Sequence, residues 1–577
     1  MNAWLQGARR WLNRLVFVAA FGVLVISGVA MVCSFDWPIV HDAGLLHYDG
    51  WLVANGEVPY VDFFEMNFPG MILIHALVHA LLGPSDLALR SADAMLLSLL
   101  FAFTFLALPS RRPRASPSTF DVAFPKPLRA GPETDRFDAW SWTAVRLAGA
   151  AFMPLYILSD GAQNAFQRDT FVALAFSAAA WCVTNRVETE TVRRGGSEWR
   201  SPSFDVMRAF ACGLVVGLSS TVKPTAILVL PLVGWSFGWR PRSLLAVGAG
   251  LIVVPGVVLG WLASNNALGS LLDIFVHYTI PLYAQIVARS QGVLRFGMLV
   301  RANAFVASLL GFSLLSTLGH IAYRAWNKRR IAPDRTPGAQ GPDSWLSFAR
   351  SPYLSYGVFL ILGAGHVAAQ SRGSFYHYYP LIWSGFLVVS WGILAAQRAF
   401  SSRPVLAGTG AGAGGRVSML ALTFVFFIVV ALAGSYAIKR AVVSCRSFEN
   451  RTQAIARVIE KNVEPGVPIL AMDTVYGVIN ALRVTEHPLA GRFIYDLHFF
   501  HDTHHPYIRA LSRELVATVN ASTTKYILIS AQGWGAGTKG FDRVSKIPGF
   551  AAGLRAYELV EGTRDVQLYR RKTSSLQ

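Results

Sequence analysis

Two aspartates near the N-terminus have a spacing that suits chemistry. Asp42 and Asp49 are seven residues apart in the stretch 41–54, where apolar side chains recur at near-helical spacing and Asn55-Gly56 supplies a stop signal. Residues seven apart lie on nearly the same face of a helix. A carboxylate fixed in this way can act as a general base and remove a proton from a reacting hydroxyl. The alternative is that both are ordinary solvated acids of a surface loop.

Cationic and aromatic residues elsewhere in the chain could serve such a site. Arginine offers a bidentate fork to phosphate and lysine a point charge. The candidates for phosphate contact are Arg168, Lys223, Arg372 and His377. The alternative for each is a side chain that only extends towards a membrane interface, and Arg168 can also pair with its neighbour Asp169. Tyr378 belongs to an aromatic group with Tyr376 and Tyr379, which suits either an interfacial belt or stacking on a sugar or prenyl chain.

The sequence signals no cofactor. The four cysteines have no CxxC spacing, so neither a disulfide framework nor a cysteine metal site is indicated. The segment His501-Asp-Thr-His504-His505 has metal-ligand residue types, but it has the character of a loop and no second cluster supports it. We therefore predict no metal site, while the sequence leaves open whether a divalent cation takes part.

Composition indicates a membrane protein. The chain is 53% hydrophobic and only 15% charged, whereas soluble domains average about 25% charged residues. Its mean hydropathy is +0.41, and the apolar residues form blocks of 15 to 22, long enough to cross a hydrocarbon core of about 30 Å. The net charge of +19 comes from basic residues between these blocks, a pattern typical of cytoplasmic loops. We expect membrane lipid, and not nucleic acid, as a partner.

The apolar blocks predict an α-helical polytopic membrane protein with about eleven transmembrane helices. The predicted spans are 15–35, 87–108, 142–160, 170–184, 207–221, 224–238, 243–263, 303–322, 353–370, 379–396 and 417–437. A cytoplasmic N-terminus leaves the basic loops inside and the first loop, 34–86, outside; residues 34–69 contain no lysine or arginine. We expect interfacial helices in that loop.

The C-terminal segment has a different character from the spans. We predict a catalytic membrane domain over residues 1–437 and a small extracytoplasmic α/β domain over 438–577. Residues 452–462 form an amphipathic pattern, and 467–472, 526–530 and 566–569 have the pattern of short strands. The expected location is the cell membrane.

Several motifs follow one another in an order that resembles the GT-C superfamily of polyprenyl-phosphate-sugar glycosyltransferases, of the protein mannosyltransferase and aminoarabinose transferase type. After Asp42 come Gly56-Glu-Val-Pro-Tyr-Val-Asp62 and Phe68-Pro69-Gly70, and later Gln167-Arg168-Asp169, Val222-Lys223-Pro224 and Phe375-Tyr-His377-Tyr-Tyr-Pro380. The resemblance covers most of residues 15–440. Two departures stand out: Asn67-Phe68 replaces the lysine that many relatives carry before the Pro-Pro step, and Ala43 follows Asp42 where protein mannosyltransferases have a glutamate.

The resemblance implies a membrane glycosyltransferase of the cell envelope. Such an enzyme moves a sugar from a polyprenyl-phosphate donor to the hydroxyl of an extracytoplasmic glycan, lipid or protein acceptor, with inversion and with Asp42 as general base. The substrate-binding residues that it implies are Asp49, Asp62, Arg168, Asp169, Lys223, Arg372, His377 and Tyr378. The alternative is a transporter or flippase of a lipid or sugar. A transporter calls for ionisable residues near mid-bilayer, whereas here the acids gather in one external loop.

Overall fold

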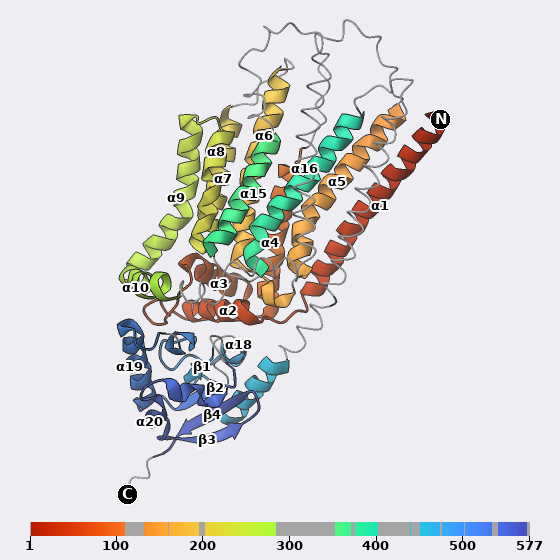
Figure 1. Cartoon of the computed structure of the whole chain (residues 1–577). Coiled ribbons are helices and arrows are strands. Elements are labelled where there is room, and N and C mark those ends of the chain that lie inside the picture. The colour runs from red at the N-terminus through yellow and green to blue at the C-terminus, as the bar shows by residue number, and fades with distance from the viewer. Residues whose placement is uncertain are drawn as a thin grey trace.

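The structure is a computed structural model, and it describes residues 2–109, 132–159, 161–194, 202–283, 352–370, 375–401, 439, 450–473, 476–500, 502–532 and 540–573. Figure 1 shows three layers along the long axis of the molecule. A bundle of long helices holds the N-terminus at its far end, two short helices lie across the opposite end, and the C-terminal domain packs beyond them.

The bundle consists of long apolar helices that run side by side (Figure 1). They are α1 (Asn2–Ser34), α4 (Asp86–Ala107), α5 (Pro132–Ser159), α6 (Arg168–Arg194), α7 (Pro202–Val222), α9 (Pro241–Ser264), α15 (Pro352–Gln370) and α16 (Tyr379–Ser401). Within the described residues, five helices are long and apolar enough to cross a membrane. The mostly helical polytopic fold that the sequence predicts is thereby confirmed. The predicted spans 303–322 and 417–437 lie outside the described residues.

One predicted span, 224–238, does not form a continuous helix. It is a 3₁₀ helix, η3 (Pro224–Val229), followed by the seven-residue helix α8 (Leu230–Ser236). Pro224 and Pro231 explain the break, because neither has a backbone N–H to donate to the helical ladder. The segment therefore crosses the bundle beside α6 and α7 in two short helical pieces, from the end of α7 to the start of α9.

Glycines allow α7 and α9 to approach closely. Added side chains at Gly213 and Gly217 would clash with the backbone of Val247 and Leu251, and one at Gly250 would clash with α7. Small residues four apart are a common device for close helix contact in membranes, where van der Waals packing drives association. The α7–α9 pair is thus fixed by backbone-to-backbone contact.

The second layer is built from the first external loop. Helices α2 (His41–Ala54) and α3 (Pro69–Leu82) lie across the end of the bundle (Figure 1). They pack tightly because a side chain at Gly50 would meet the backbone of His75. The loop after α9 extends this layer with α10 (Leu268–Ile274) and a π-helix, η4 (Phe275–Tyr283).

The C-terminal domain is a small α/β unit. It contains a helix over 450–462, α18 (Val478–Val484), η6 (Leu497–Phe500), α19 (Pro506–Asn520), η7 (Phe541–Lys546) and α20 (Phe550–Leu554). Its strands are β1 (Ile469–Met472), β2 (Tyr526–Ser530), β3 (Tyr557–Gly562) and β4 (Val566–Arg571), in the order β1-β2-β4-β3. Only the β1–β2 pair is parallel. The helix and three strands occur where the sequence predicts them; β3, a mostly exposed edge strand, has no buried run to signal it.

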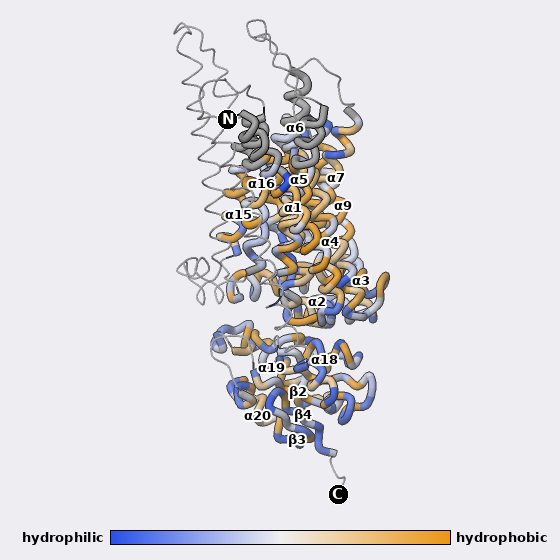
Figure 2. The backbone as a smooth tube through the Cα atoms, turned by 90° about the vertical axis from the view of Figure 1, so that its right-hand side faces the viewer, coloured by the Kyte–Doolittle hydropathy of each residue, from blue (hydrophilic) through white to orange (hydrophobic). Residues whose placement is uncertain are grey.

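The domain docks directly on the second layer. The Tyr48 hydroxyl donates to the carbonyl of His487 at 2.8 Å, and the Asn480 amide donates to the carbonyl of Ile39 at 2.6 Å. Arg483 donates to the carbonyl of Pro84 at 2.9 Å. Figure 2 shows that the bundle is mainly hydrophobic and that the C-terminal domain carries many more hydrophilic residues. The two parts therefore suit a membrane and its aqueous border.

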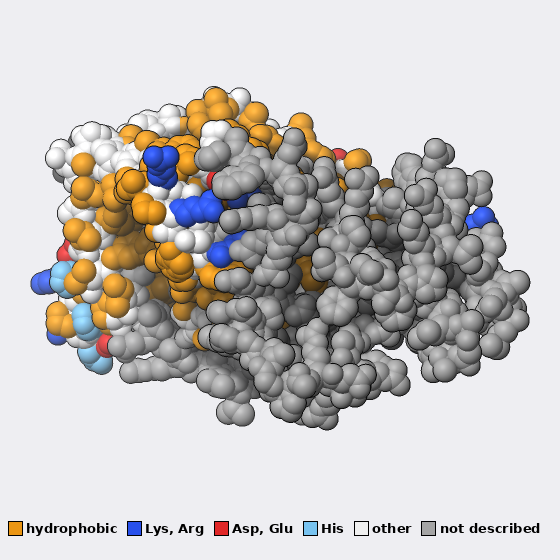
Figure 3. Space-filling model, turned by 90° about the horizontal axis from the view of Figure 1, so that it is seen from above, with side chains coloured by type: hydrophobic (Ala, Val, Ile, Leu, Met, Phe, Trp, Pro, Cys, Tyr) orange, Lys and Arg blue, Asp and Glu red, His pale blue; other side chains and the backbone are white. Residues whose placement is uncertain are grey.

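Basic side chains occur at the far end of the bundle. Figure 3, a view onto that end, shows lysine or arginine side chains among hydrophobic ones. Arg208 and Arg240, at the starts of α7 and α9, both lie within 4 Å of the Asp205 carboxylate, at 2.9 and 3.7 Å. The basic end and the C-terminal domain thus lie on opposite sides of the bundle.

Candidate active site

Asp42 lies where the second layer meets the bundle, in contact with residues from two distant parts of the chain. One of its carboxylate oxygens is 3.4 Å from Arg168 Nη2, at the start of α6, and accepts a hydrogen bond of 3.2 Å from the Tyr376 hydroxyl. Tyr376 is in the short 3₁₀ helix η5 (Phe375–Tyr378). The other oxygen is 3.0 Å from His41 Nδ1. The side chain keeps 21% of its surface exposed, so a small reactant can reach it.

The local backbone presents Asp42 at the first turn of α2. Its predecessor His41 has a φ of 57°, in the left-handed region that costs energy for any residue but glycine. That sharp entry directs the first turn of the helix towards the bundle. The N-terminus of a helix also stabilises a negative charge through the helix dipole.

The surroundings of Asp42 favour its ionised form. Burial alone would raise the pKa of its carboxyl, but the charges of His41 and Arg168 and the hydrogen bond from Tyr376 outweigh burial and hold the pKa below its ordinary value. Asp42 is therefore a carboxylate at neutral pH. A lowered pKa also makes Asp42 a weaker proton acceptor, as long as His41 and Arg168 stay beside it.

Arg168 has a second partner, Asn67, whose side-chain oxygen accepts from the guanidinium. Asn67 is fixed in turn by Glu65, whose carboxylate accepts 2.6 Å hydrogen bonds from both the backbone and the side-chain nitrogen of Asn67. The sequence marked Asn67 only as a departure from the family pattern and gave no signal for Glu65. The four residues form a continuous polar chain from the loop to Asp42.

A second, buried cluster lies beside the first. The Asp169 carboxylate receives Lys223 Nζ at 2.8 and 2.7 Å, and His366 Nε2 lies 2.7 Å away. His377 Nδ1 is 3.3 Å from the same carboxylate and 3.2 Å from the lysine nitrogen. Asp169 therefore pairs with Lys223 and not with Arg168. Breaking such a buried pair costs about 3–5 kcal/mol, because it leaves one charge without compensation.

This cluster joins four elements and thereby fixes the start of α6. Asp169 and Arg168 are adjacent in α6, Lys223 directly follows α7, His366 is in α15 and His377 is in η5. With Asp169 anchored, the backbone of Arg168 has little freedom. The predicted residues Arg168, Asp169, Lys223 and His377 thus gather around Asp42, in two adjoining groups.

The other predicted residues have different surroundings. Asp49 is fully buried, and its carboxyl group lies next to that of Glu65. Burial, followed by the neighbouring Glu65, raises the pKa of Asp49 well above its usual range. Asp62 is exposed and accepts from the Val58 backbone N–H at 2.7 Å. Tyr378 is buried beside His377, and Arg372 lies outside the described residues.

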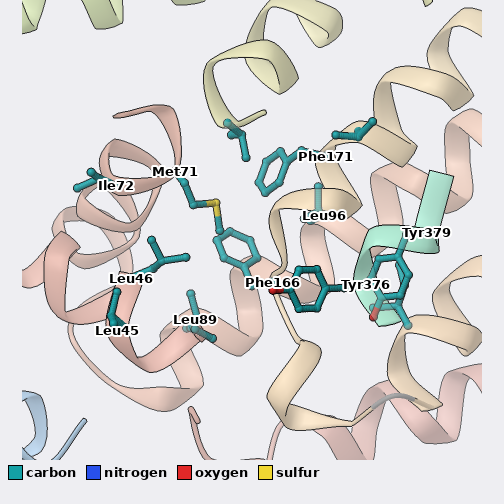
Figure 4. Close-up of a cluster of buried hydrophobic side chains, with 14 of the residues drawn as sticks. Leu45, Leu46, Met71, Ile72, Leu89, Leu96, Phe166, Phe171, Tyr376 and Tyr379 are labelled. Carbon is teal, nitrogen blue, oxygen red and sulfur yellow. The ribbon is translucent and has the colours of Figure 1, made fainter. Parts of the chain in front are cut away.

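Apolar side chains pack next to the candidate site. In Figure 4, Phe166 lies between Met71 of α3 and Tyr376 of η5. The Phe166 backbone N–H donates to the Asp93 carboxylate at 2.9 Å, and its ring meets His75 edge-on at 5.2 Å between centroids. This packing connects the second layer, the bundle and the segment that carries Tyr376.

The histidines of the C-terminal domain show no metal centre among the described residues. No group of three or more His, Cys, Asp or Glu side chains is arranged there to hold an ion. His505 caps α19 by accepting from the Tyr507 N–H at 3.2 Å, and His501 lies outside the described residues.

The fold and the site define a polytopic membrane protein with a polar candidate centre at one end of its helix bundle, under a small α/β domain. No family model and no curated protein matches the sequence. Solved structures of similar fold include ArnT from Cupriavidus metallidurans bound to undecaprenyl phosphate, at 15% identity and a TM-score of 0.50 over 98% of both chains. They also include the same protein in the apo state, at 13% identity and a TM-score of 0.50 over 95% of this chain and 96% of that one. The arabinofuranosyltransferase AftD from Mycobacteria matches at 12% identity and 0.42 over 96% of this chain and 40% of its own. The chain therefore has the fold of ArnT.

Proposed function

We propose that the protein is an inverting glycosyltransferase that moves a sugar from a polyprenyl-phosphate donor to an extracytoplasmic acceptor hydroxyl. The observation that carries the proposal is the contact of a partly exposed carboxylate, Asp42, with a cation suited to phosphate, Arg168, at the end of an apolar bundle. The structure of ArnT with undecaprenyl phosphate bound supports the class of donor. The acceptor is a glycan, lipid or protein hydroxyl.

In the proposed transfer, Asp42 accepts a proton from the acceptor and Arg168 stabilises the charge of the leaving phosphate. The acceptor hydroxyl gives its proton to Asp42, its oxygen bonds to the anomeric carbon, and the bond from that carbon to the phosphate oxygen breaks. Polyprenyl phosphate leaves with one more negative charge, which Arg168 stabilises. Because attack and departure take place on opposite sides of the carbon, the configuration inverts.

In this proposal Arg168 also links donor binding to the base. At 3.4 Å its contact with Asp42 is longer than a charge-assisted hydrogen bond of about 2.7–2.9 Å, so the guanidinium, held in place by Asn67, can also donate to a bound phosphate. A phosphate that shares this charge raises the pKa of Asp42 and makes the carboxylate a better base. Donor binding would thus activate the base.

Further residues of the site have supporting roles in this proposal. The Asp169–Lys223 pair positions Arg168, Tyr376 orients the Asp42 carboxylate, and Arg372 and Tyr378 take part in donor binding. Asp49 and Asp62 belong to the loop that carries Asp42. We propose no organic cofactor, and the sequence leaves open whether a divalent cation takes part.

The proposed orientation has the N-terminus in the cytoplasm and the C-terminal domain outside. The basic end of the bundle supports it, because cytoplasmic loops retain lysine and arginine. The location is then the cell membrane. A transporter is less well supported, because the ionisable clusters lie at the end of the bundle next to the C-terminal domain, where α6 begins and α7 ends.

The test compares cells with and without the gene. Mass spectrometry of envelope glycans, lipids and proteins should show a product that loses the mass of one sugar in the deletion strain. Purified protein should then release free polyprenyl phosphate from the lipid extract of that strain. If the deletion changes no glycosylated product and vesicles with the purified protein show counterflow of a lipid or sugar, the transferase proposal is wrong.

A further inference from the structure

The C-terminal domain sends one side chain into the loop that holds the candidate site. The Tyr495 hydroxyl donates to Glu65 Oε1 at 2.5 Å, and the two side chains are almost fully buried. The backbone supports the contact, since the N–H of Phe64 donates to the carbonyl of Arg492 at 2.6 Å. A residue more than 400 positions away thus completes the surroundings of the loop carboxylate.

Glu65 collects several donors on one oxygen. Besides Tyr495, its Oε1 accepts from Met66 N at 2.7 Å and from the backbone and side-chain nitrogens of Asn67, both at 2.6 Å. A carboxylate held by this many donors is strongly fixed in place. The orientation of the neighbouring Asn67 amide depends on it.

The contacts define which way the Asn67 amide faces. Its oxygen meets Arg168, a guanidinium that can only donate. Its nitrogen then faces the other way and donates to Glu65 Oε1. The contacts at both ends of the amide are therefore consistent with one orientation. Its oxygen attracts Arg168 and carries no formal charge that would compete with Asp42.

We infer that Tyr495, Glu65 and Asn67 form a positioning relay that holds Arg168 beside Asp42, so that the C-terminal domain completes the active site. The inference rests on the proposed function. Tyr495 does not touch the reacting atoms in this account. It acts through Glu65 and Asn67 on the guanidinium that receives the leaving phosphate.

A matched pair of tyrosines tests the relay. Tyr48 and Tyr495 are both buried, and each donates one hydroxyl hydrogen bond across the same junction between the C-terminal domain and the first loop. Only Tyr495 reaches Glu65. In full-length purified protein we expect Tyr495→Phe to lower kcat for polyprenyl-phosphate release roughly tenfold with little change in the KM for the acceptor, and Tyr48→Phe to leave kcat within about twofold.

The link to Arg168 is tested by a double-mutant cycle. Once Arg168→Gln removes the group on which the relay acts, adding Tyr495→Phe should lower kcat no further. Asn67→Ala should reproduce the kcat loss of Tyr495→Phe within the loop itself, with the exposed Asn55→Ala as its control. Thermal melting of each variant separates loss of folded protein from loss of turnover.

Several results would overturn the inference. If Tyr495→Phe and Tyr48→Phe lower kcat equally, Tyr495 serves only to dock the C-terminal domain. The same conclusion follows if the effects of Tyr495→Phe and Arg168→Gln on kcat are additive. If Tyr495→Phe does not fold, normal kcat in Asn67→Ala would have the same consequence. These outcomes leave the proposed function intact, whereas retained transfer in Asp42→Asn would remove that function whatever the relay variants do.

Discussion

Replacing Arg168 by glutamine should both slow transfer and change its pH dependence. The guanidinium is 3.4 Å from the Asp42 carboxylate, and both side chains are mostly buried. A charge-assisted contact to the leaving phosphate contributes about 1.5–3 kcal/mol, which corresponds to a loss of roughly 10- to 150-fold in kcat when the contact is removed.

The pH effect has a definite sign. Burial raises the pKa of Asp42, and the charges of His41 and Arg168 with the Tyr376 hydrogen bond pull it below its ordinary value. An opposite charge this close lowers a carboxyl pKa by about 1–3 pH units, so its removal raises the pKa by a similar amount. Asp42 is active when ionised; the acid limb of kcat/KM should therefore move to higher pH in Arg168→Gln.

The assay is release of free polyprenyl phosphate by purified protein between about pH 3 and pH 9, a range that begins below the ordinary aspartate pKa of about 3.9. Arg168→Lys is the control: it restores the charge but not the fork, so it should shift the acid limb less and recover only part of kcat. Wild-type kcat together with an unmoved acid limb in Arg168→Gln would refute both the phosphate contact and the electrostatic link to Asp42.

Two further predictions concern the bundle and its orientation. Lys223→Met should lower the free energy of unfolding by about 3–5 kcal/mol, because it leaves the Asp169 carboxylate buried without its cation, and Lys223→Arg should lower it by less. Thermal melting in detergent measures both variants, and an unchanged melting temperature in Lys223→Met would contradict the buried pair. Single cysteines at the exposed positions Asn55 and Arg242, in a cysteine-free background, should differ in their reaction with an impermeant thiol reagent added to intact cells. The reagent should label position 55 and not position 242, and labelling of position 242 would reverse the proposed topology.

The site residues that the sequence predicts best are those that belong to local patterns. The acidic first turn of α2 and the Gln-Arg-Asp and Val-Lys-Pro steps each follow or precede an apolar block, so their common end of the bundle follows from the order of the spans. Apolar length likewise predicts most of the helices that the structure describes. Residues 224–238 cross the bundle as the sequence predicts, but they do so in two short helical pieces, because two prolines interrupt an otherwise apolar run.

The remaining features depend on contacts between distant parts of the chain. The pairing of Asp169 with Lys223 and histidines joins residues up to 208 positions apart, and no local pattern distinguishes it from a pair with the adjacent arginine. Glu65 and Tyr495 belong to none of the motifs that the sequence analysis singles out. Their role emerges only when the C-terminal domain docks on the first loop, which hydropathy does not encode.

The central claim is that Asp42 removes the proton of the acceptor. Its most direct test is release of polyprenyl phosphate by purified Asp42→Asn, compared with wild-type protein on the same lipid extract and acceptor fraction. The amide keeps the size of the side chain and cannot accept the proton, so we expect at least a hundredfold loss of turnover with an unchanged melting profile and unchanged donor binding. Turnover within a few-fold of wild type in folded Asp42→Asn would contradict the account.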